Sequence, residues 1–295
     1  MFAIILADTN DAGLEPLTSR LPHALLPLVG KPILVHLLEQ LHRNNITDVM
    51  VVSPDHHDRL ARSIDTGPLL GMRINFASEL PDLRRNPDDT LVIGSRYLVD
   101  LNWRLITASL SENNGCENSM MITSSAKPVA LIVPPGASDL VPDNWTDVEQ
   151  MVIPRVSEDS PPVLNIDSLK NYVDANFRLL NEKFQHFFPA GRQNIAGLYV
   201  SPKATVKTQS LQSNNAYVGS YSRIDAAATL HGDVVVGEKV VIDKGASISN
   251  SIILDGTYVG AMTRCNNAII HQNLLIRVDS GICVEINDPV LVSAC

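Results

Sequence analysis

The chain has 295 residues, of which 45% are hydrophobic and 19% charged, and its formal net charge is −9. This is the composition of a folded globular protein, and the length allows one large domain or two of about 100–200 residues. The acidic balance argues against nucleic acid as the main partner, because binding a phosphate backbone needs concentrated lysine and arginine. It leaves room for a local pocket that binds a phosphorylated small molecule.

The N-terminus carries no targeting signal that we can identify. Its apolar residues 2–7 lack a preceding basic region and are followed at once by Asp8, so the sequence predicts no signal peptide. No run approaches the ~20 apolar residues that a membrane helix requires. We therefore expect a cytoplasmic protein without membrane insertion. The four cysteines show neither CxxC pairing nor zinc spacing, which favours reduced structural thiols.

The first half of the chain alternates short apolar runs with helical patterns. The predicted strands are residues 2–7, 48–53, 73–77, 90–94, 120–123 and 129–133. Between the first strands, residues 33–41 predict an amphipathic helix and residues 55–64 a polar one. Strands that alternate with helices pair in parallel, so we expect a Rossmann-like α/β domain.

Prolines interrupt the pattern between residues 134 and 162, which predicts a loop-rich connection with one short strand near 149–153. Asp167 or Ser168 is placed to cap a helix that runs to about Phe187. Its predicted buried side consists of apolar residues at helical spacing: Leu169, Val173, Phe177, Leu180 and Phe184.

A strict period of six begins at residue 218. Seven aliphatic residues stand six apart: Val218, Ile224, Leu230, Val236, Ile242, Ile248 and Leu254. The register then shifts to Val259, Cys265 and Ile276. Such a repeat is typical of a parallel β-helix, in which each hexapeptide forms one flat side and points one aliphatic side chain inward. Residues 199–206 resemble an opening coil, so we place the junction near residues 191–197.

Three segments resemble the sugar-phosphate nucleotidyltransferases, which make NDP-sugars from an NTP and a sugar 1-phosphate. Residues 5–18 (ILADTNDAGLEPLT) and 21–33 (LPHALLPLVGKPI) resemble the family opening L-A-G-G-x-G-T-R-L-x-P-L-T, P-K-x-L-L-P-L-x-G-K-P-I. Residues 165–176 (NIDSLKNYVDAN) resemble its D-I-G-T-P-E-x-Y-L-x-A-N stretch. A left-handed β-helix at the C-terminus fits members similar to mannose-1-phosphate guanylyltransferase. The resemblance spans nearly the whole chain.

The positions that carry the family's chemistry differ here. Asp8, Thr9 and Asp11 replace loop glycines that let backbone N–H groups approach the phosphates. Gly13 stands where the family has a phosphate-binding arginine, and His23 where it has a lysine. The resemblance implies two Mg²⁺-binding aspartates, which become Ser95 and Asn165. The E-K-P and N-A-G segments of the sugar-binding half are not recognisable.

Several residues leave alternatives open. Arg20 could replace the missing arginine, and Lys31 in the retained G-K-P could contact a ligand. A two-residue shift of the alignment would offer Asp100 or Asp167 as one metal ligand. Hexapeptide β-helices also occur in acyltransferases, where His231 or His271 could serve as general base.

We therefore expect residues 1–190 to form a nucleotidyltransferase-like domain with a shortened sugar-binding half, and residues 197–290 to form the β-helix. The expected function is that of a catalytically impaired homologue without a metal cofactor. It would act as a regulatory, scaffold or sugar-nucleotide-binding protein in NDP-sugar or polysaccharide metabolism. It would form homo-oligomers, or hetero-oligomers with an active nucleotidyltransferase through the β-helix. The alternatives are an active, Mg²⁺-dependent nucleotidyltransferase with a non-standard site and a hexapeptide-repeat acyltransferase.

Overall fold

The computed structural model describes residues 1–7, 12–64, 71–81, 88–101, 120–124, 127–135, 141, 145–151, 155–157, 162–195, 197–212 and 215–286. The chain forms two compact units. The first comprises Met1–Leu26, Pro32–Asp167 and Phe184–Phe187, and the second Pro27–Lys31, Ser168–Lys183 and Phe188–Cys295. Helix α5 (Leu169–Asn181) is thus part of the second unit, although the sequence suggested a division near residue 190.

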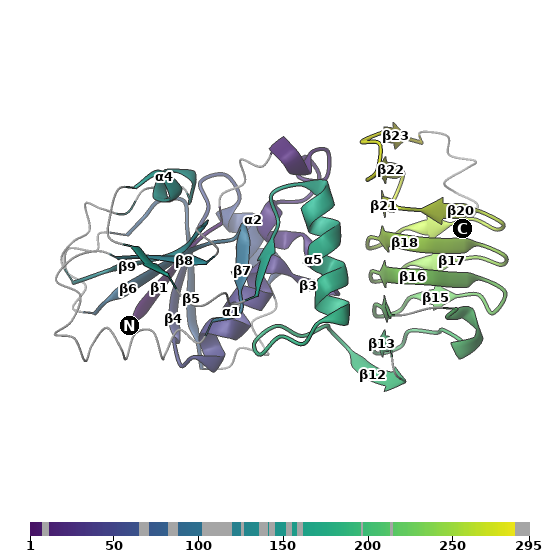
Figure 1. Ribbon diagram of the computed structural model, residues 1–295, viewed down its shortest axis with the longest axis horizontal. Coiled ribbons are helices and arrows are strands. Elements are labelled where there is room, and N and C mark those ends of the chain that lie inside the picture. Colours follow the sequence, from purple (N-terminus) through teal and green to yellow (C-terminus); the bar gives the residue numbers. More distant parts are fainter. Residues whose placement is uncertain are drawn as a thin grey trace. The chain divides into compact units, whose positions relative to one another are not determined.

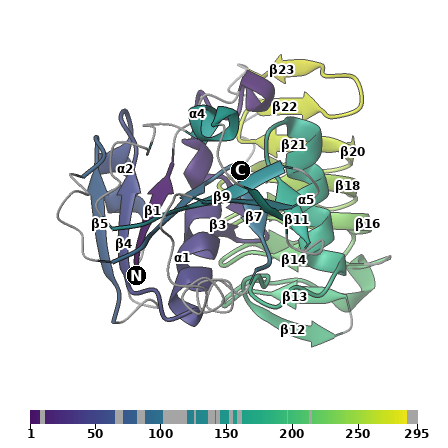
Figure 2. The same cartoon turned by 60° about the vertical axis from the view of Figure 1, so that its left-hand side comes forward.

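The first unit is built on a seven-stranded sheet of order β10-β8-β9-β6-β1-β4-β5. Its strands are β1 (Phe2–Leu6), β4 (Asp48–Val52), β5 (Arg73–Ala77), β6 (Thr90–Gly94), β8 (Met120–Ser124), β9 (Lys127–Val133) and β10 (Arg155–Ser157). Figure 2 shows β5, β4 and β1 side by side. Helix α2 (His57–Ser63) follows β4, as predicted.

The expectation of parallel pairing holds for only part of this sheet. Strand β1 pairs in parallel with β4 and β6, and β4 pairs in parallel with β5. Strand β9 runs antiparallel to both β6 and β8, so the sheet is mixed. No helix precedes β9, because only residues 125–126 separate it from β8, and so short a connection returns the chain in the opposite direction.

Helix α1 (Ile33–Arg43) buries the face that its spacing predicted. Ile33, Leu34, Leu38 and Leu41 are fully buried. The same face also buries Gln40, whose Nε2 donates to the carbonyls of Val99 (2.6 Å) and Leu101 (3.1 Å). These bonds fasten the end of β7 (Tyr97–Val99), a strand that the sequence analysis missed and that pairs antiparallel with β11 (Val163–Asn165).

The structure also corrects the prediction for residues 149–153. The strand predicted at 149–153 is wrong where the structure describes it, since Glu149 and Gln150 belong to helix α4 (Trp145–Gln150). This helix is anchored by the buried side chains of Trp145 and Val148, three residues apart on one face. Residues 152–153 lie outside the described residues.

Helix α5 begins at the predicted cap but ends early. Ser168 is the N-cap, and its side chain accepts a hydrogen bond from the Asn171 N–H at 3.3 Å. The helix stops at Asn181 and not at Phe187. Of the predicted buried side, Leu180 is confirmed, and Phe184 is buried beyond the end of the helix. The other buried residues of the helix are Tyr172, Ala175, Asn176 and Leu179. Val173 and Phe177 are only half-buried, because α5 presents its polar Tyr172–Asn176 side to the structure around it.

In the second unit the chain alternates between two sheets. The larger contains β12 (Arg192–Ile195), β13 (Leu198–Val200), β14 (Ala216–Val218), β16 (Thr229–Val236), β18 (Ser247–Ile253), β20 (Arg264–Asn266), β21 (Ala268–His271), β22 (Leu274–Arg277) and β23 (Cys283–Glu285). The smaller contains β15 (Arg223–Ile224), β17 (Val241–Ile242) and β19 (Tyr258–Val259). From β13 to β21 the pairing is parallel, and the strands stack one above another (Figure 1).

Left-handed residues recur in this unit in three columns. One contains Lys203, Tyr221, Lys239, Gly256 and Gln272, the second Gly232, Asn250 and Asn267, and the third Gly245 and Met262. All have positive φ, and within each column they are 16–18 residues apart. A residue in this conformation turns the backbone sharply, so each column marks a corner at which successive turns of chain change direction.

The six-residue pattern is confirmed as the interior pattern. Val218, Ile224, Leu230, Val236, Ile242 and Ile248 are at most 2% exposed and belong to one core cluster. The five-residue step comes one repeat earlier than predicted, between Ile248 and Ile253 and not between Leu254 and Val259. Val236 pairs with Ile253 and not with Leu254, because Asn250 alone occupies the corner that Gly232 and Asp233 form one turn earlier. The interior column therefore continues through Ile253, Val259 and Cys265.

The stack ends in antiparallel strands. Strand β22 pairs with β21 and then with β23, and their ribbons form the hairpin at one end of the stack in Figure 2. Ile276, predicted to continue the repeat, is buried in β22. No helix among the described residues is both long and apolar enough to cross a membrane.

Candidate functional site

The candidate site lies in the first unit, where β1, β4 and β6 end. Ligands of open α/β sheets bind at the carboxyl edge of the strands. A pocket of about 510 Å³ opens at this edge beyond β4 and β5, lined by Val52, Pro54, Ser78, Glu79 and Leu80. Among the described residues that line it, the one with a charge is Glu79, and an acid is a poor environment for a phosphate. Asp8, Thr9 and Asp11, in the loop after β1, lie outside the described residues.

His23, which the resemblance predicts at the position of the family lysine, is fully buried and hydrogen-bonded through both ring nitrogens. Its Nε2 lies 2.9 Å from the carbonyl oxygen of Ile166, and its Nδ1 lies 3.0 Å from Ser95 Oγ. A carbonyl only accepts, so Nε2 carries a proton, and in the neutral ring Nδ1 accepts from the serine hydroxyl. Two positions predicted as degenerate, His23 and Ser95, thus bond to each other and form a link inside the fold.

Asn165, which the resemblance predicts at the second metal position, is the last residue of β11. Its Nδ2 donates to Asp167 Oδ2 at 2.7 Å, and its Oδ1 is buried without a hydrogen-bond partner among the described residues. Mg²⁺ is held in proteins mainly by carboxylate oxygens. Ser95 and Asn165 supply a neutral hydroxyl, engaged by His23, and a neutral amide. The described residues contain no cluster of three or more histidine, cysteine or acidic side chains that could hold a metal. This donor set does not fit the magnesium site of the family.

Asp100, which a shifted alignment would offer as a metal ligand, is hydrogen-bonded to the backbone. Its carboxylate accepts from the backbone N–H groups of Gln185 (2.6 Å) and His186 (2.9 Å). The His186 ring adds a contact of 2.7 Å through Nδ1. Asp100 is 9% exposed. These bonds hold the segment after α5 in the first unit and leave Asp100 little room to ligate a metal.

A polar group beside Ser95 was not predicted. Arg96 and Glu149 form an ion pair at 3.6 Å. The pKa of the neighbouring Tyr97 is raised to about 12, first by burial and then by the negative charge of Glu149. The ammonium of Lys127 lies 5.9 Å from the centre of the Tyr97 ring. The sequence offered one signal for this polar group, the position of Tyr97 two residues after Ser95. The strand β7 and the helix α4, which bring Tyr97 and Glu149 together, were not predicted.

The remaining predicted contacts differ in their placement. Gly13 is exposed in the short helix Ala12–Leu14. Arg20 is half-buried, and its carbonyl accepts from Arg59 Nη2 at 2.9 Å. Lys31 belongs to the second unit, in the two-residue strand β3 (Lys31–Pro32) beside β2 (Pro27–Leu28). The structure therefore joins His23 to Ser95 and to Ile166, the residue after Asn165. Among the residues it describes, it does not bring several cationic side chains together.

Two family models match the chain. Residues 2–109 match the nucleotidyl transferase model, and residues 197–294 match the model described as the GMPPB C-terminal domain. These two matches confirm the resemblance to the sugar-phosphate nucleotidyltransferases in the N-terminal and C-terminal parts of the chain.

Two relatives of the chain are distant in sequence but similar in extent. It is 20% identical to a UTP–glucose-1-phosphate uridylyltransferase of Synechocystis, over 92% of this chain and 87% of the relative. It is also 20% identical to a glucose-1-phosphate thymidylyltransferase of Streptomyces griseus, over 92% of this chain and 81% of the relative. A structure described as a glucose-1-phosphate thymidylyltransferase from Bacillus anthracis, 16% identical, aligns with a TM-score of 0.44 over 60% of this chain and 94% of that one.

Several residues of the segments that carry the resemblance pack within the second unit. Tyr172 donates to the Pro27 carbonyl at 2.6 Å, and Asn176 Oδ1 accepts from the Val29 N–H at 3.0 Å. Gly30 has φ +85° and lies so close to the Tyr217 ring that a Cβ would overlap it. The Y-x-x-A-N stretch thus hydrogen-bonds to the backbone just before G-K-P, and Gly30 of G-K-P packs on Tyr217.

Proposed function

We propose that this chain is a nucleotidyltransferase homologue with impaired catalysis. It would act as a regulatory, scaffold or sugar-nucleotide-binding protein in NDP-sugar or polysaccharide metabolism. The observation that carries the proposal is the state of His23. A group that is fully buried and hydrogen-bonded on both ring nitrogens cannot reach a triphosphate as the family lysine does.

The chemistry of the family explains why these changes would be severe. Attack of a sugar phosphate on the α-phosphate of an NTP develops charge that cationic groups must stabilise. Removing one such stabilising group costs about 10²–10³ in rate. Here Gly13 and His23 replace two cations, and Ser95 and Asn165 replace two carboxylates. We derive no catalytic step through a metal, because the donor set does not fit one.

For the second unit we propose a left-handed parallel β-helix. Three observations support a three-sided coil: the alternation between two sheets, the three columns of left-handed residues, and the interior aliphatic column with steps of six. Such coils stack into oligomers through their flat faces and end strands. We propose that this unit pairs with another copy or with an active nucleotidyltransferase, and that the protein works in the cytoplasm.

The test of the proposed function is pyrophosphate release at high protein concentration, with Mg²⁺, across a panel of NTPs and sugar 1-phosphates. We expect no release above a heat-treated control, in protein whose circular dichroism shows that it is folded. Arg20→Gln serves as the matched variant. Release by the natural chain that disappears in this variant would contradict the proposal and assign the chemistry to a new residue.

A second measurement addresses the binding role. Calorimetric titration with NDP-sugars should show saturable binding if the site recognises a sugar nucleotide. Co-elution with an active family member in size-exclusion chromatography, absent in a truncated partner without its C-terminal domain, would support the scaffold role. If the chain shows neither binding nor co-elution, and remains inactive, the regulatory proposal fails.

A further inference from the structure

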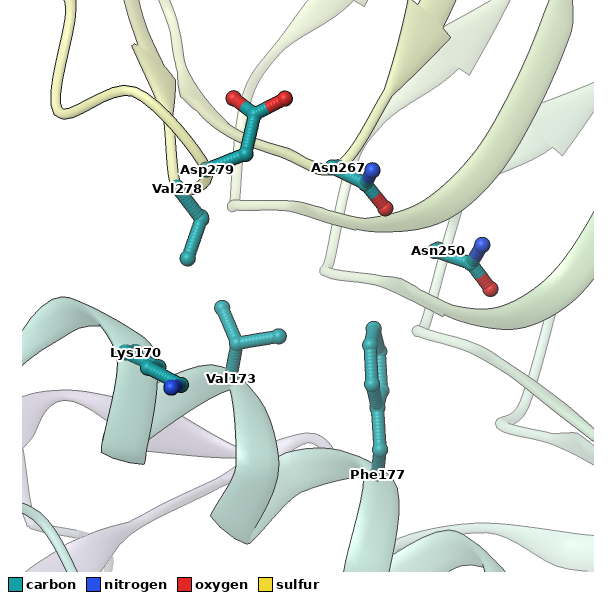
Figure 3. A pocket seen from close by; sticks show the side chains of 7 residues that line it. All are labelled: Lys170, Val173, Phe177, Asn250, Asn267, Val278 and Asp279. Carbon is teal, nitrogen blue, oxygen red and sulfur yellow. The ribbon is translucent and has the colours of Figure 1, made fainter.

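The second unit contains a pocket between α5 and the corner of the stacked strands. It has a volume of about 270 Å³ and is lined by Lys170, Val173, Phe177, Asn250, Asn267, Val278 and Asp279. Figure 3 shows Val173 and Val278 pointing toward each other while Phe177 rises from α5 toward the two asparagines. Every lining residue belongs to the second unit. The pocket is therefore separate from the candidate site at the sheet edge.

The floor of this pocket is apolar and includes one aromatic ring. Val173, Phe177 and Val278 are half-buried. Val173 and Phe177 belong to the apolar spacing of α5 that the sequence predicted as buried. In the fold, the helix instead buries its Tyr172–Asn176 side, and this leaves the two side chains facing the pocket. A flat ring that covers Phe177 would remove this apolar surface from water.

The wall of the pocket offers hydrogen bonds that the described residues do not use. Asn250 and Asn267 follow one another in the second corner column, 17 residues apart, and both have positive φ. Asn250 Oδ1 accepts from the Asp233 N–H at 3.3 Å, and no described residue accepts from its NH₂ group. Nor does any described residue bond to the side chain of Asn267. A primary amide presents a donor and an acceptor side by side, which matches the edge of a nucleobase.

The rim carries one cation, Lys170, and one acid, Asp279. Asp279 is neutralised by an ion pair with Arg277, whose Nη2 lies 2.5 Å from Asp279 Oδ2, and its carboxylate points away from α5 in Figure 3. Lys170, in the first turn of α5, has no ion-pair partner among the described residues. This ammonium is available to an anionic group of a ligand.

We propose that this pocket binds a nucleotide, with the base against Phe177 and Asn267 and a phosphate at Lys170. A sugar phosphate would satisfy Lys170 but would set hydroxyl groups against the apolar floor. An acyl chain would cover the floor but leave the Asn267 amide unused. The volume is below the roughly 300–1,000 Å³ of pockets for larger ligands, so a mononucleotide portion fits better than an extended molecule. The proposal holds whether or not the first unit binds a sugar nucleotide.

The test is calorimetric titration of the full chain with AMP, GMP, UMP and CMP, and with ribose 5-phosphate as the ligand that lacks a base. We expect saturable binding of at least one mononucleotide, and binding of ribose 5-phosphate at least about 10-fold weaker. Lys170→Gln should weaken nucleotide binding by about 10–100-fold, the range for a hydrogen bond to a charged group. Asn267→Gly, which keeps the left-handed corner, should weaken it by about 5–10-fold.

Lys183→Gln is the matched control, because Lys183 is exposed just beyond the end of α5 and does not line the pocket. It should bind as the natural chain does. The proposal is overturned if no mononucleotide binds at millimolar concentration, or if ribose 5-phosphate binds as tightly as the nucleotide. It is equally overturned if nucleotide binds but neither pocket variant weakens it. That last result would place binding elsewhere, leaving the proposed function of the first unit intact.

Discussion

The two units differ in how regular their sequence pattern is. In the second, the aliphatic residues at interior positions and the left-handed residues at corners continue from turn to turn. In the first, two residues that the resemblance predicts as replaced site positions, His23 and Ser95, bond to each other. An interior position accepts only side chains that fill it, whereas a position at the end of a strand can exchange a ligand contact for a local hydrogen bond.

The largest effect should come from the interior of the second unit. Ile242 is fully buried, so Ile242→Ala should lower the free energy of unfolding by about 2–5 kcal/mol through lost burial and a cavity. The half-buried neighbour Val241 is the control, and Val241→Ala should cost about 1 kcal/mol or less. Urea unfolding of both variants measures the difference. Equal losses would show that the six-residue pattern does not define an interior.

The retained G-K-P turn should be nearly as sensitive. Gly30→Ala combines the cost of a left-handed conformation with overlap against Tyr217, together about 2–4 kcal/mol. Gly71→Ala isolates the first cost and should lose about 1 kcal/mol, since Gly71 has φ +93° and a Cβ added there would meet no heavy atom of the described residues within 4 Å. Thermal unfolding of the two variants compares them. A smaller loss for Gly30→Ala would mean that the turn does not pack on Tyr217.

A smaller effect is expected at the edge of the first unit. Ser95→Ala removes the partner of His23 Nδ1 and should cost about 1–2 kcal/mol, because a buried nitrogen loses its hydrogen bond. Ser19→Ala, at an exposed serine that bonds to the Pro16 carbonyl, should change the unfolding free energy by about 0.5 kcal/mol or less. If Ser95→Ala is as neutral as this control in urea unfolding, the link between His23 and Ser95 is not formed.

The smallest effect is a shift in titration. Tyr97 in the first unit and Tyr217 in the second both have a pKa of about 12, raised chiefly by burial, but only Tyr97 has the charge of Glu149 as its next cause. Because the pKa of each tyrosine is higher in the folded chain than in the unfolded chain, each contributes to stability, and the contribution is complete below pH ~10, the unfolded pKa. The contribution is lost as the pH rises through the folded pKa of about 12. Glu149→Gln should lower the pKa of Tyr97 and leave Tyr217 unchanged. Carbon NMR of labelled tyrosine across roughly pH 9–13 measures the pKa of both rings. An equal change in both pKa values in the Glu149→Gln variant would contradict the assigned role of Glu149.

The contrast between the units also marks what the sequence could predict. The repeat from Val218 to Ile248 was readable because each interior position repeats the same steric demand. Asn250 shows the limit: a one-residue corner in place of two moved the register to Ile253, and no periodicity indicates such a deletion. The end of α5 was missed because apolar spacing continues through Phe184, while Asp100, far away in sequence, holds Gln185 and His186 in a different unit.

The candidate site was predictable in part. The replaced positions His23 and Ser95 could be named from the resemblance, but their mutual hydrogen bond depends on a contact across 72 residues. The Arg96, Tyr97 and Glu149 group was missed because the chain between residues 134 and 162 gives weak local signals, and the helix that carries Glu149 resembled a strand.

The division of the chain sets an order in time. The turn of residues 27–31 is made early, yet its partners Tyr172 and Asn176 lie 145 and 147 residues later. At roughly 5–20 residues per second, a ribosome needs about 7–30 seconds to add that length. During this interval the central strands β4 and β6 of the first unit are synthesised while the second unit is still unfinished. Vectorial synthesis therefore cannot complete the two units one after the other, and a chaperone that shields early segments has a defined interval in which to act.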